Sequence, residues 1–228
     1  AEGKGMILQN QLSSMEWEDL THFEGNANAF RLLTHQFRGR RKGGFVMTYS
    51  TLASIVKYPF PSILAGKKPK FGFFTTEIED YIKIAEELGI KRLSLEGEPI
   101  KYARHPLVFL VEAADDICYQ MMDIEDAYKL KLLTPRETKE LYQLFLDEKK
   151  KERVEEVFRL VTDENEQIAY LRATVIGLLV KECTQVFMDN EEAILNGTFE
   201  GALIKHISDP LNNAYKQCSK VAVEKIYR

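Results

Sequence analysis

The sequence predicts an all-α protein. Apolar residues recur along most of the chain with the period of amphipathic helices, and no stretch alternates apolar and polar residues over a convincing strand length. Hydrophobic residues make up 45% of the 228 residues, which is enough to bury a sizeable core. We therefore expect helices packed around a common interior, without a β-sheet.

The first ninety residues are expected to form three helices joined by irregular segments. A polar loop at 1–15 leads into a helix over 17–33, which has apolar residues on one face. A second helix is predicted over 49–56, because two prolines follow it closely. The segment 65–76 carries glycines and a proline and should be irregular. A third, amphipathic helix is predicted over 77–88, with a glycine next as its C-cap.

Pro106 opens the most regular helix of the chain, which is expected to run to about Leu130. Its apolar or small residues on one stripe are Leu107, Leu110, Val111, Ala114, Cys118 and Met121. We expect that stripe to face a core. Further apolar residues, such as Ile117 and Ile124, lie outside the stripe, so the helix is apolar on more than one side, as a central helix would be.

The last hundred residues are also helical in pattern. Thr-Pro-Arg-Glu at 134–137 has an N-cap threonine, a proline in the first turn and a glutamate at the capping-box position, which predicts a helix to about Lys150. The charged stretch 147–156 is expected to be a solvated helix face or a linker. A long helix is predicted over 163–190, and a break is expected near Gly197.

Composition excludes several classes of protein. The net charge of -4 gives no bulk electrostatic reason to expect nucleic-acid or membrane binding, and no apolar run is long enough to span a bilayer. The three cysteines are far apart and form no CxxC pair, which argues against a disulfide framework or a zinc site. The N-terminal residues show no signal-peptide pattern. We therefore expect a cytoplasmic protein.

The central helix carries the best candidate for a functional site. Asp115, Tyr119 and Asp123 are spaced four residues apart, so a helix places them on one face about 6 Å apart along its axis. Asp115 lies next to the apolar stripe, whereas Asp116 points away from it. A carboxylate at the edge of a core is costly unless it is paired or binds a metal, which favours Asp115 as a metal ligand. From spacing alone, an ordinary acidic helix face is the commoner explanation.

Four segments, in this order, resemble the dGTPase family of HD-domain deoxynucleoside triphosphate triphosphohydrolases. They are WEDLTHFEGNANAFRLLT at 17–34, TYSTLASIVKYP at 48–59, KFGFF at 70–74 and HPLVFLVEAADDICYQMMDIEDA at 105–127. The resemblance implies an HD-domain-like helical bundle, of which residues 1–133 would be the C-terminal part, followed by a helical region over 134–228. It also implies hydrolysis of a dNTP, with dGTP foremost, to the deoxynucleoside and inorganic triphosphate.

The resemblance assigns roles by position. Asp115 matches the last ligand of the family's divalent metal ion, which would be Mg, Mn or Fe. Tyr119 matches the residue that packs against the deoxyribose, and Asp123 matches the acceptor of the sugar 3′-hydroxyl. Asn26 matches the asparagine of the family's Glu-Gly-Asn-Ala motif, and Lys57, Tyr58 and Lys70 match phosphate- or sugar-contacting positions, so we expect all four to bind substrate. Lysines suit that role, because a triphosphate carries about four negative charges.

The chain departs from the family in one large respect. No His-Asp dipeptide occurs in it, and the family's catalytic His-x-Gly-Glu stretch is also absent, so one of four expected metal ligands is present. We therefore expect no catalytic residue within this chain, and we expect both motifs upstream of Ala1. A C-terminal part of this kind should be inactive alone.

Two alternatives stay open. The chain could belong to another HD-type nucleotide phosphohydrolase, such as a nucleotidase. It could also be a catalytically silent nucleotide-binding or assembly module, which the missing ligands would permit.

The remaining features have ordinary and functional explanations. The basic stretch 38–44 is most often a solvated loop, although it could contact a nucleotide effector, single-stranded DNA or another subunit of a homo-oligomer. His22 and His35 are expected to be surface or core-edge residues, although either could face the site, and His105 is expected to mark the start of a helix. Arg172 would either reach the triphosphate or extend to water from an apolar helix.

Overall fold

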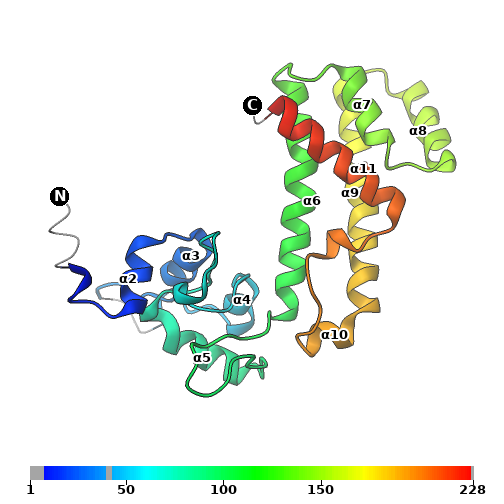
Figure 1. Ribbon diagram of the computed structural model, residues 1–228. Coiled ribbons are helices and arrows are strands. Elements are labelled where there is room, and N and C mark those ends of the chain that lie inside the picture. The colour runs from blue at the N-terminus through cyan, green and yellow to red at the C-terminus, as the bar shows by residue number, and fades with distance from the viewer. Residues whose placement is uncertain (1–7, 40–42, 227–228) are drawn as a thin grey trace. The chain divides into compact units, whose positions relative to one another are not determined.

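The structure is a computed structural model that describes residues 8–39 and 43–226 (Figure 1). Within these ranges the chain is helical, and the only β-type pairings are two isolated bridges, Pro61 with Phe73 and Arg92 with Tyr102. The predicted all-α class is confirmed.

Two predictions fall on residues outside the described ranges. The middle of the basic stretch 38–44 is one of these places, and the first seven residues of the loop expected at 1–15 are the other. The expectation that the His-Asp and His-x-Gly-Glu motifs lie upstream of Ala1 concerns residues that are not in this sequence, and it stays a prediction.

The chain divides into two compact units. The first contains the residues up to Val111 and Glu191–Phe199, and the second contains Glu112–Asn190 and the residues from Glu200 onward. One boundary between them falls within a long helix, α6 (Pro106–Lys129). The boundary expected between residues 133 and 134 concerns the extent of a catalytic domain, and it stays a prediction.

The helices of the first unit are short. They are α2 (Ser14–Thr21), α3 (Gly25–Thr34), α4 (Tyr49–Ser54), η1 (Ser62–Leu64), η2 (Thr75–Glu77), α5 (Ile78–Glu87) and α10 (Glu191–Leu195). The predicted helices at 49–56 and 77–88 are confirmed as α4 and α5, and Gly89 follows α5 with a φ of 64°. That left-handed backbone conformation is the one a C-cap glycine supplies without strain.

The single helix expected over 17–33 is wrong, because the chain breaks between α2 and α3. Glu24 is the N-cap of α3, and its side chain accepts hydrogen bonds from the backbone N–H groups of Asn26 and Ala27 at 2.5 and 3.3 Å. Leu20 and Phe23, expected on the buried face, are 63% and 71% exposed. The apolar residues keep a helical spacing from α2 into α3, although the helix itself ends and a new one begins after the N-cap Glu24.

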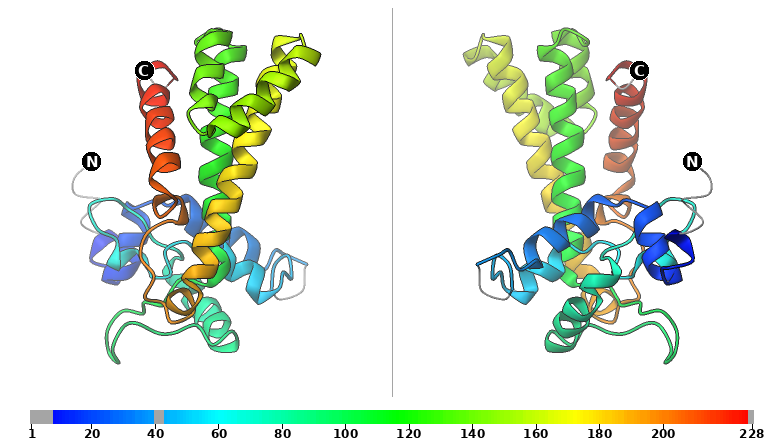
Figure 2. Two further views of the ribbon diagram at one scale, coloured as in Figure 1. Left: turned by 90° about the vertical axis from the view of Figure 1, so that its right-hand side faces the viewer. Right: turned by 90° about the vertical axis from the view of Figure 1, so that its left-hand side faces the viewer.

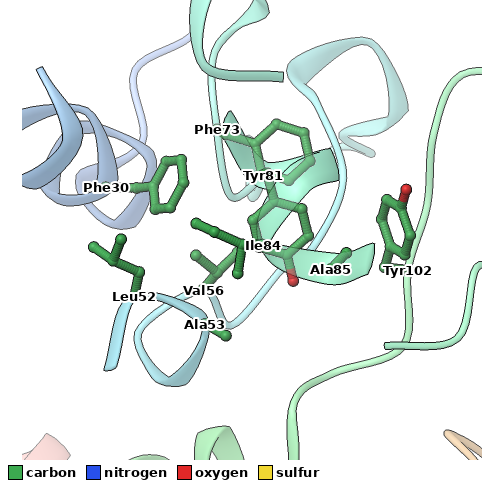
Figure 3. Packing of buried hydrophobic residues seen from close by; sticks show 9 residues of the cluster. All are labelled: Phe30, Leu52, Ala53, Val56, Phe73, Tyr81, Ile84, Ala85 and Tyr102. Atoms are coloured by element: carbon green, nitrogen blue, oxygen red, sulfur yellow. The ribbon is translucent and has the colours of Figure 1, made fainter. Parts of the chain in front are cut away.

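The first unit is held together by an aromatic core (Figure 3). Phe73 stacks on Tyr81 of α5 with ring centroids 4.6 Å apart, and Phe30 of α3 meets Tyr81 edge-on at 5.9 Å. Such aromatic pairs bury large areas and contribute about 1 kcal/mol beyond that burial. This core anchors α3 and the segment that carries Phe73, which are the two elements that bear Asn26 and Lys70.

The helices of the second unit are longer. Besides most of α6, they are α7 (Pro135–Gln143), α8 (Glu148–Leu160), α9 (Glu164–Asp189), η3 (Leu203–Lys205), α11 (Asp209–Val221) and η4 (Ala222–Ile226). The predicted helix at 163–190 is confirmed as α9. The helix expected from Thr134 to about Lys150 is instead two helices, since α7 ends at Gln143. Asp147 caps α8, so the charged stretch 147–156 is a helix rather than a linker.

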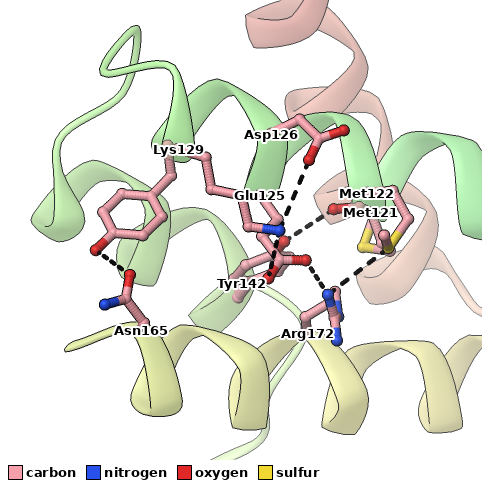
Figure 4. A network of polar contacts seen from close by, with 9 residues as sticks. Met121, Met122, Glu125, Asp126, Lys129, Tyr142, Asn165 and Arg172 are labelled. Atoms are coloured by element: carbon pink, nitrogen blue, oxygen red, sulfur yellow. Dashed lines mark hydrogen bonds and ion pairs between the residues drawn. The ribbon is translucent and has the colours of Figure 1, made fainter. Parts of the chain in front are cut away.

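Helices α6 and α9 lie side by side and antiparallel (Figures 1 and 2). Glu125 of α6 pairs with Arg172 of α9, and Tyr128 donates to Asn165 at 2.9 Å, so the residue numbers rise in one helix as they fall in the other. Figure 4 shows this network, in which Lys129 also approaches Glu125 at 3.4 Å. The buried Glu125 carboxylate is thereby compensated by two cations.

The prediction of which side of α6 faces a core is wrong. Of the six residues of the predicted stripe, Met121 is buried, while Leu107, Leu110, Val111, Ala114 and Cys118 are exposed. The buried side carries Ala113, Ile117 and Ile124 instead. Tyr142 of α7 reaches the same side and donates to the Met121 carbonyl at 2.9 Å. Because α6 is apolar on more than one side, the choice of side was decided by the helices that pack on it.

None of the described helices combines the length and the apolar character that a membrane crossing requires.

Candidate functional site

In the first unit, a buried carboxylate gathers two of the predicted residues. Glu24 is 4% exposed, and its Oε1 accepts a hydrogen bond from Lys70 Nζ at 2.9 Å. The same residue accepts from the Asn26 backbone N–H at 2.5 Å and from Asn26 Nδ2 at 3.5 Å. Asn26 and Lys70 are 44 positions apart in the sequence, so Glu24 is the residue that brings them together.

Lys57 and Tyr58 lie within electrostatic reach of Lys70. Lys57 Nζ lies 5.9 Å from the centre of the Tyr58 ring. A Cβ atom on Gly72 would overlap the Tyr58 carbonyl oxygen, so only glycine allows these two backbones to approach so closely. The two segments that carry Tyr58 and Lys70 are thus held against each other.

The pKa of Lys70 reports the charges around it. It is raised, first by the hydrogen bond to Glu24 and by that carboxylate's charge, and burial opposes the rise weakly. Tyr58 raises the same pKa and Lys57 lowers it, which places both within electrostatic reach of Lys70. A lysine ammonium has three N–H donors, and Glu24 takes one of them. Two cations, Lys57 and Lys70, therefore lie in this part of the first unit.

In the second unit, Asp115 and Tyr119 line a pocket of about 220 Å³. Asp116 and Gln120 of α6 and Tyr215 of α11 complete its lining. Tyr119 is 60% exposed, so its ring is available to a ligand. Of the three residues predicted from the i, i+4 spacing, Asp115 and Tyr119 therefore line one pocket. Asp123, one turn further along α6, does not line it.

The reason given for preferring Asp115 over Asp116 does not hold in the structure. The stripe beside Asp115 is exposed, and Asp115 is exposed with it, whereas Asp116 is partly buried. The choice of Asp115 as a metal ligand now rests on the resemblance, and it stays a prediction.

Sequence analysis missed Gln120 and Tyr215. Tyr215 donates a hydrogen bond to the Asp116 backbone carbonyl at 3.0 Å, and burial raises its pKa. Ser219, one turn further along α11, donates to Gln120 Oε1 at 2.6 Å. Each of these two contacts joins positions 99 residues apart in the sequence. The only signal in the sequence was that Asp116 and Gln120, like Tyr215 and Ser219, are four residues apart, which is about one helix turn.

The donor set does not fit a complete metal site. In the part of the chain that the structure describes, no group of three or more His, Cys, Asp or Glu side chains is placed to hold an ion. One carboxylate, Asp115, binds a divalent metal poorly by itself. These residues are at most one part of a metal site.

The other singled-out residues have structural roles. His22 forms an ion pair with Glu18 at 2.9 Å, and His105 Nδ1 accepts from the Leu107 backbone N–H at 3.2 Å, as a residue at a helix start does. Arg172, for which two roles were open, pairs with the buried Glu125.

Two larger pockets lie in the first unit, with volumes of about 580 and 650 Å³. Both are lined by Arg31 and Thr76, and none of the predicted site residues lines either. Volume alone is a weaker guide to a site than converging polar groups, so we treat the residues around Glu24 in the first unit and the Asp115 pocket in the second unit as two separate candidate sites.

Comparison with known proteins adds two kinds of finding. No protein-family model matches the chain. Curated proteins named deoxyguanosinetriphosphate triphosphohydrolase-like protein do match it. The one from Pseudomonas aeruginosa is 34% identical over 239 aligned positions, which cover 100% of this chain and 51% of the relative. The one from Synechocystis is 34% identical over 203 positions, which cover 85% of this chain and 44% of the relative. The chain thus spans about half the length of these relatives.

Proposed function

Because the chain belongs to the family of deoxyguanosinetriphosphate triphosphohydrolase-like proteins, we propose that it is the nucleotide-binding part of a dNTP triphosphohydrolase. The substrate would be a dNTP, with dGTP foremost, and the products would be the deoxynucleoside and inorganic triphosphate. The observation that carries this proposal is that Glu24 brings Asn26 and Lys70 together, while Lys57 and Tyr58 lie within electrostatic reach of Lys70.

The first unit would bind the phosphates. Lys57 and Lys70 supply positive charge, and the amide of Asn26 supplies a polar group beside them. Glu24 neutralises part of the charge of Lys70, and it also fixes the position of the Lys70 ammonium. We propose that this positioning is the main effect of Glu24 on a bound ligand. Fixed donors cost less free energy on binding than flexible ones do, so Glu24 would strengthen phosphate binding despite its own negative charge.

In the second unit, described by itself, the residues around Tyr119 suit a sugar. The exposed ring of Tyr119 beside Asp115 offers an apolar face to a deoxyribose, and an added 2′-hydroxyl would meet that ring. Asp123, one helix turn beyond Tyr119, would accept a hydrogen bond from the 3′-hydroxyl. Asp115 would contribute one ligand to a divalent metal ion.

The other metal ligands and the catalytic residues would come from outside this chain. They would belong to the His-Asp and His-x-Gly-Glu motifs, which we place upstream of Ala1. Because the chain spans about half of each relative, the relatives have room for such a segment.

The test uses protein that spans the full length of the relatives. We expect dGTP to yield deoxyguanosine and inorganic triphosphate, with Lys70→Met lowering kcat/KM on the order of tenfold or more, since it removes a charged donor to phosphate. Lys91→Met, at an exposed lysine elsewhere in the first unit, is the matched control and should change little. Equal losses in both variants would contradict the phosphate role of Lys70.

Metal analysis of the same protein tests the assignment of Asp115. Asp115→Ala should lose bound divalent metal, and Asp116→Ala should lose less. Equal loss, or the reverse order, would contradict the assignment.

Product analysis separates the alternatives. A nucleotidase would release single phosphates, and a silent nucleotide-binding or assembly module would bind dGTP without releasing any product. Homo-oligomer formation, and contact of the basic stretch 38–44 with a nucleotide effector or single-stranded DNA, remain predictions that sedimentation and binding measurements can address.

A further inference from the structure

We propose that Gln120 is a further ligand-binding residue, whose side-chain amide donates a hydrogen bond to the deoxynucleoside part of the nucleotide. This inference rests on the proposed function. It names a residue and a donor group that neither the sequence pattern nor the relatives' names point to.

The position of Gln120 is set by two matched contacts between α6 and α11. Tyr215 contacts Asp116, and Ser219 contacts Gln120, so both partners advance by four residues, or one helix turn. The two helices therefore run in the same direction at this contact. Two hydrogen bonds one turn apart hold α11 in register on α6, which keeps Gln120 beside Ser219.

The amide of Gln120 has one partnered end and one unpartnered end. Its Oε1 accepts from Ser219, whereas its Nε2 has no hydrogen-bond partner among the described residues and is withdrawn from the surface. Gln120 is 9% exposed and lines the pocket that also contains Asp115 and Tyr119. A buried donor without an acceptor is unfavourable, so a ligand atom that accepts from Nε2 would relieve that cost. Gln120 lines the pocket and the terminal torsion of glutamine is soft, so its amide can reorient to meet a ligand acceptor there.

The pocket favours the neutral part of the nucleotide over its phosphates. Its volume of about 220 Å³ corresponds to roughly seven water molecules in the liquid, which suits a sugar or part of a base rather than a whole triphosphate. The ring of Tyr119 adds an apolar wall. The acceptor for Gln120 is therefore an oxygen or nitrogen of the deoxynucleoside.

The first test observes the Gln120 amide directly, in protein that spans the full length of the relatives. Its side-chain N–H resonances, identified by their loss in Gln120→Leu, should shift when deoxyguanosine or dGTP is added. Inorganic triphosphate alone should leave them in place. A shift with inorganic triphosphate alone would overturn the assignment to the deoxynucleoside.

The second test measures dGTP affinity in matched variants. Gln120→Leu should weaken binding on the order of tenfold, the usual effect of losing one buried hydrogen bond. Ser219→Ala, which keeps the amide but loses its anchor, should weaken binding less. Gln185→Leu, at an exposed glutamine of α9, should have no effect. Circular dichroism in urea checks that each variant is folded.

The outcomes separate this inference from the proposed function. If the unchanged full-length protein binds dGTP and its Gln120→Leu variant binds dGTP equally well, Gln120 is a structural residue and the inference is overturned alone. If the unchanged full-length protein does not bind dGTP at all, the inference and the proposed function are overturned together.

Discussion

Replacement of Glu24 by alanine should destabilise the first unit by about 2 kcal/mol. The change removes the N-cap of α3, whose side chain accepts from the N–H groups of Asn26 and Ala27, and losing such a cap costs about 1 kcal/mol. It also removes the ion pair with Lys70. The lysine side chain is 50% exposed, so solvent screens that pair and its contribution is at most about 1 kcal/mol.

The assay is chemical unfolding followed by tryptophan fluorescence. Trp17 is the single tryptophan of the sequence and lies on α2, so its signal reports the first unit. Glu24→Gln keeps oxygen and amide groups at the cap but loses the charge, and it should cost about half as much as alanine. A double-mutant cycle with Lys70→Met isolates the pair, and its coupling energy should be a few tenths of a kcal/mol to about 1 kcal/mol.

The same pair predicts how stability depends on pH. The pKa of Lys70 is raised above its ordinary value of 10.5 in the folded state. The stabilisation is therefore fully present below pH 10.5 and is lost as the pH rises through the raised pKa. Lys70→Met should show a smaller loss of stability in that alkaline window.

Two results would refute this reasoning. A loss of less than about 0.5 kcal/mol in Glu24→Ala would mean that the cap is replaced by water or by another group. A coupling energy of zero would mean that Glu24 does not hold Lys70 in solution.

The remaining predictions concern activity, sugar selection, packing and titration. The 228-residue chain alone should release no inorganic triphosphate from dGTP, and release at the rate of full-length protein would contradict this. In full-length protein, Tyr119→Ala should narrow the ratio of kcat/KM for dGTP over GTP, by about tenfold for each 1.4 kcal/mol of lost discrimination; an unchanged ratio with both rates lowered would make Tyr119 a packing residue. Arg172→Met should destabilise the second unit by about 2 kcal/mol. This is less than the usual cost of breaking a buried ion pair, because Lys129 remains close to Glu125. An unchanged unfolding curve followed by circular dichroism would disprove this prediction. The hydrogen bonds from Lys225 and from the Thr134 cap lower the pKa of Glu137 to about 2. In Lys225→Met this pKa should return toward 4.5, as a carboxyl titration by NMR can check. The stabilisation by this carboxylate is present above pH 4.5 and is lost as the pH falls toward 2.

Local chemistry determined most of the helix starts and stops. The capping box at Thr134 and Glu137, the proline that opens α6 and the glycine after α5 all act within four residues of themselves. Sequence analysis therefore located α5, α6 and α9 and the start of α7. It failed at Glu24, because the cap's side chain and the apolar period of the flanking residues pointed to different structures.

The candidate site divides in the same way. The i, i+4 spacing of Asp115 and Tyr119 was visible in the sequence, and the structure places both in one pocket. The resemblance selected Asn26 and Lys70, but it did not indicate that Glu24 links them across 44 positions.

The sequence by itself determined that the chain is helical, where its long helices run and which residues share a helix face. Only the tertiary structure decided which face of α6 is buried, and that Asp116 and Gln120 meet Tyr215 and Ser219. The physical reason is the range of the interactions. Helix periodicity and capping act within one turn, whereas a helix with two apolar sides has no preference between them until another helix, distant in the sequence, packs against one.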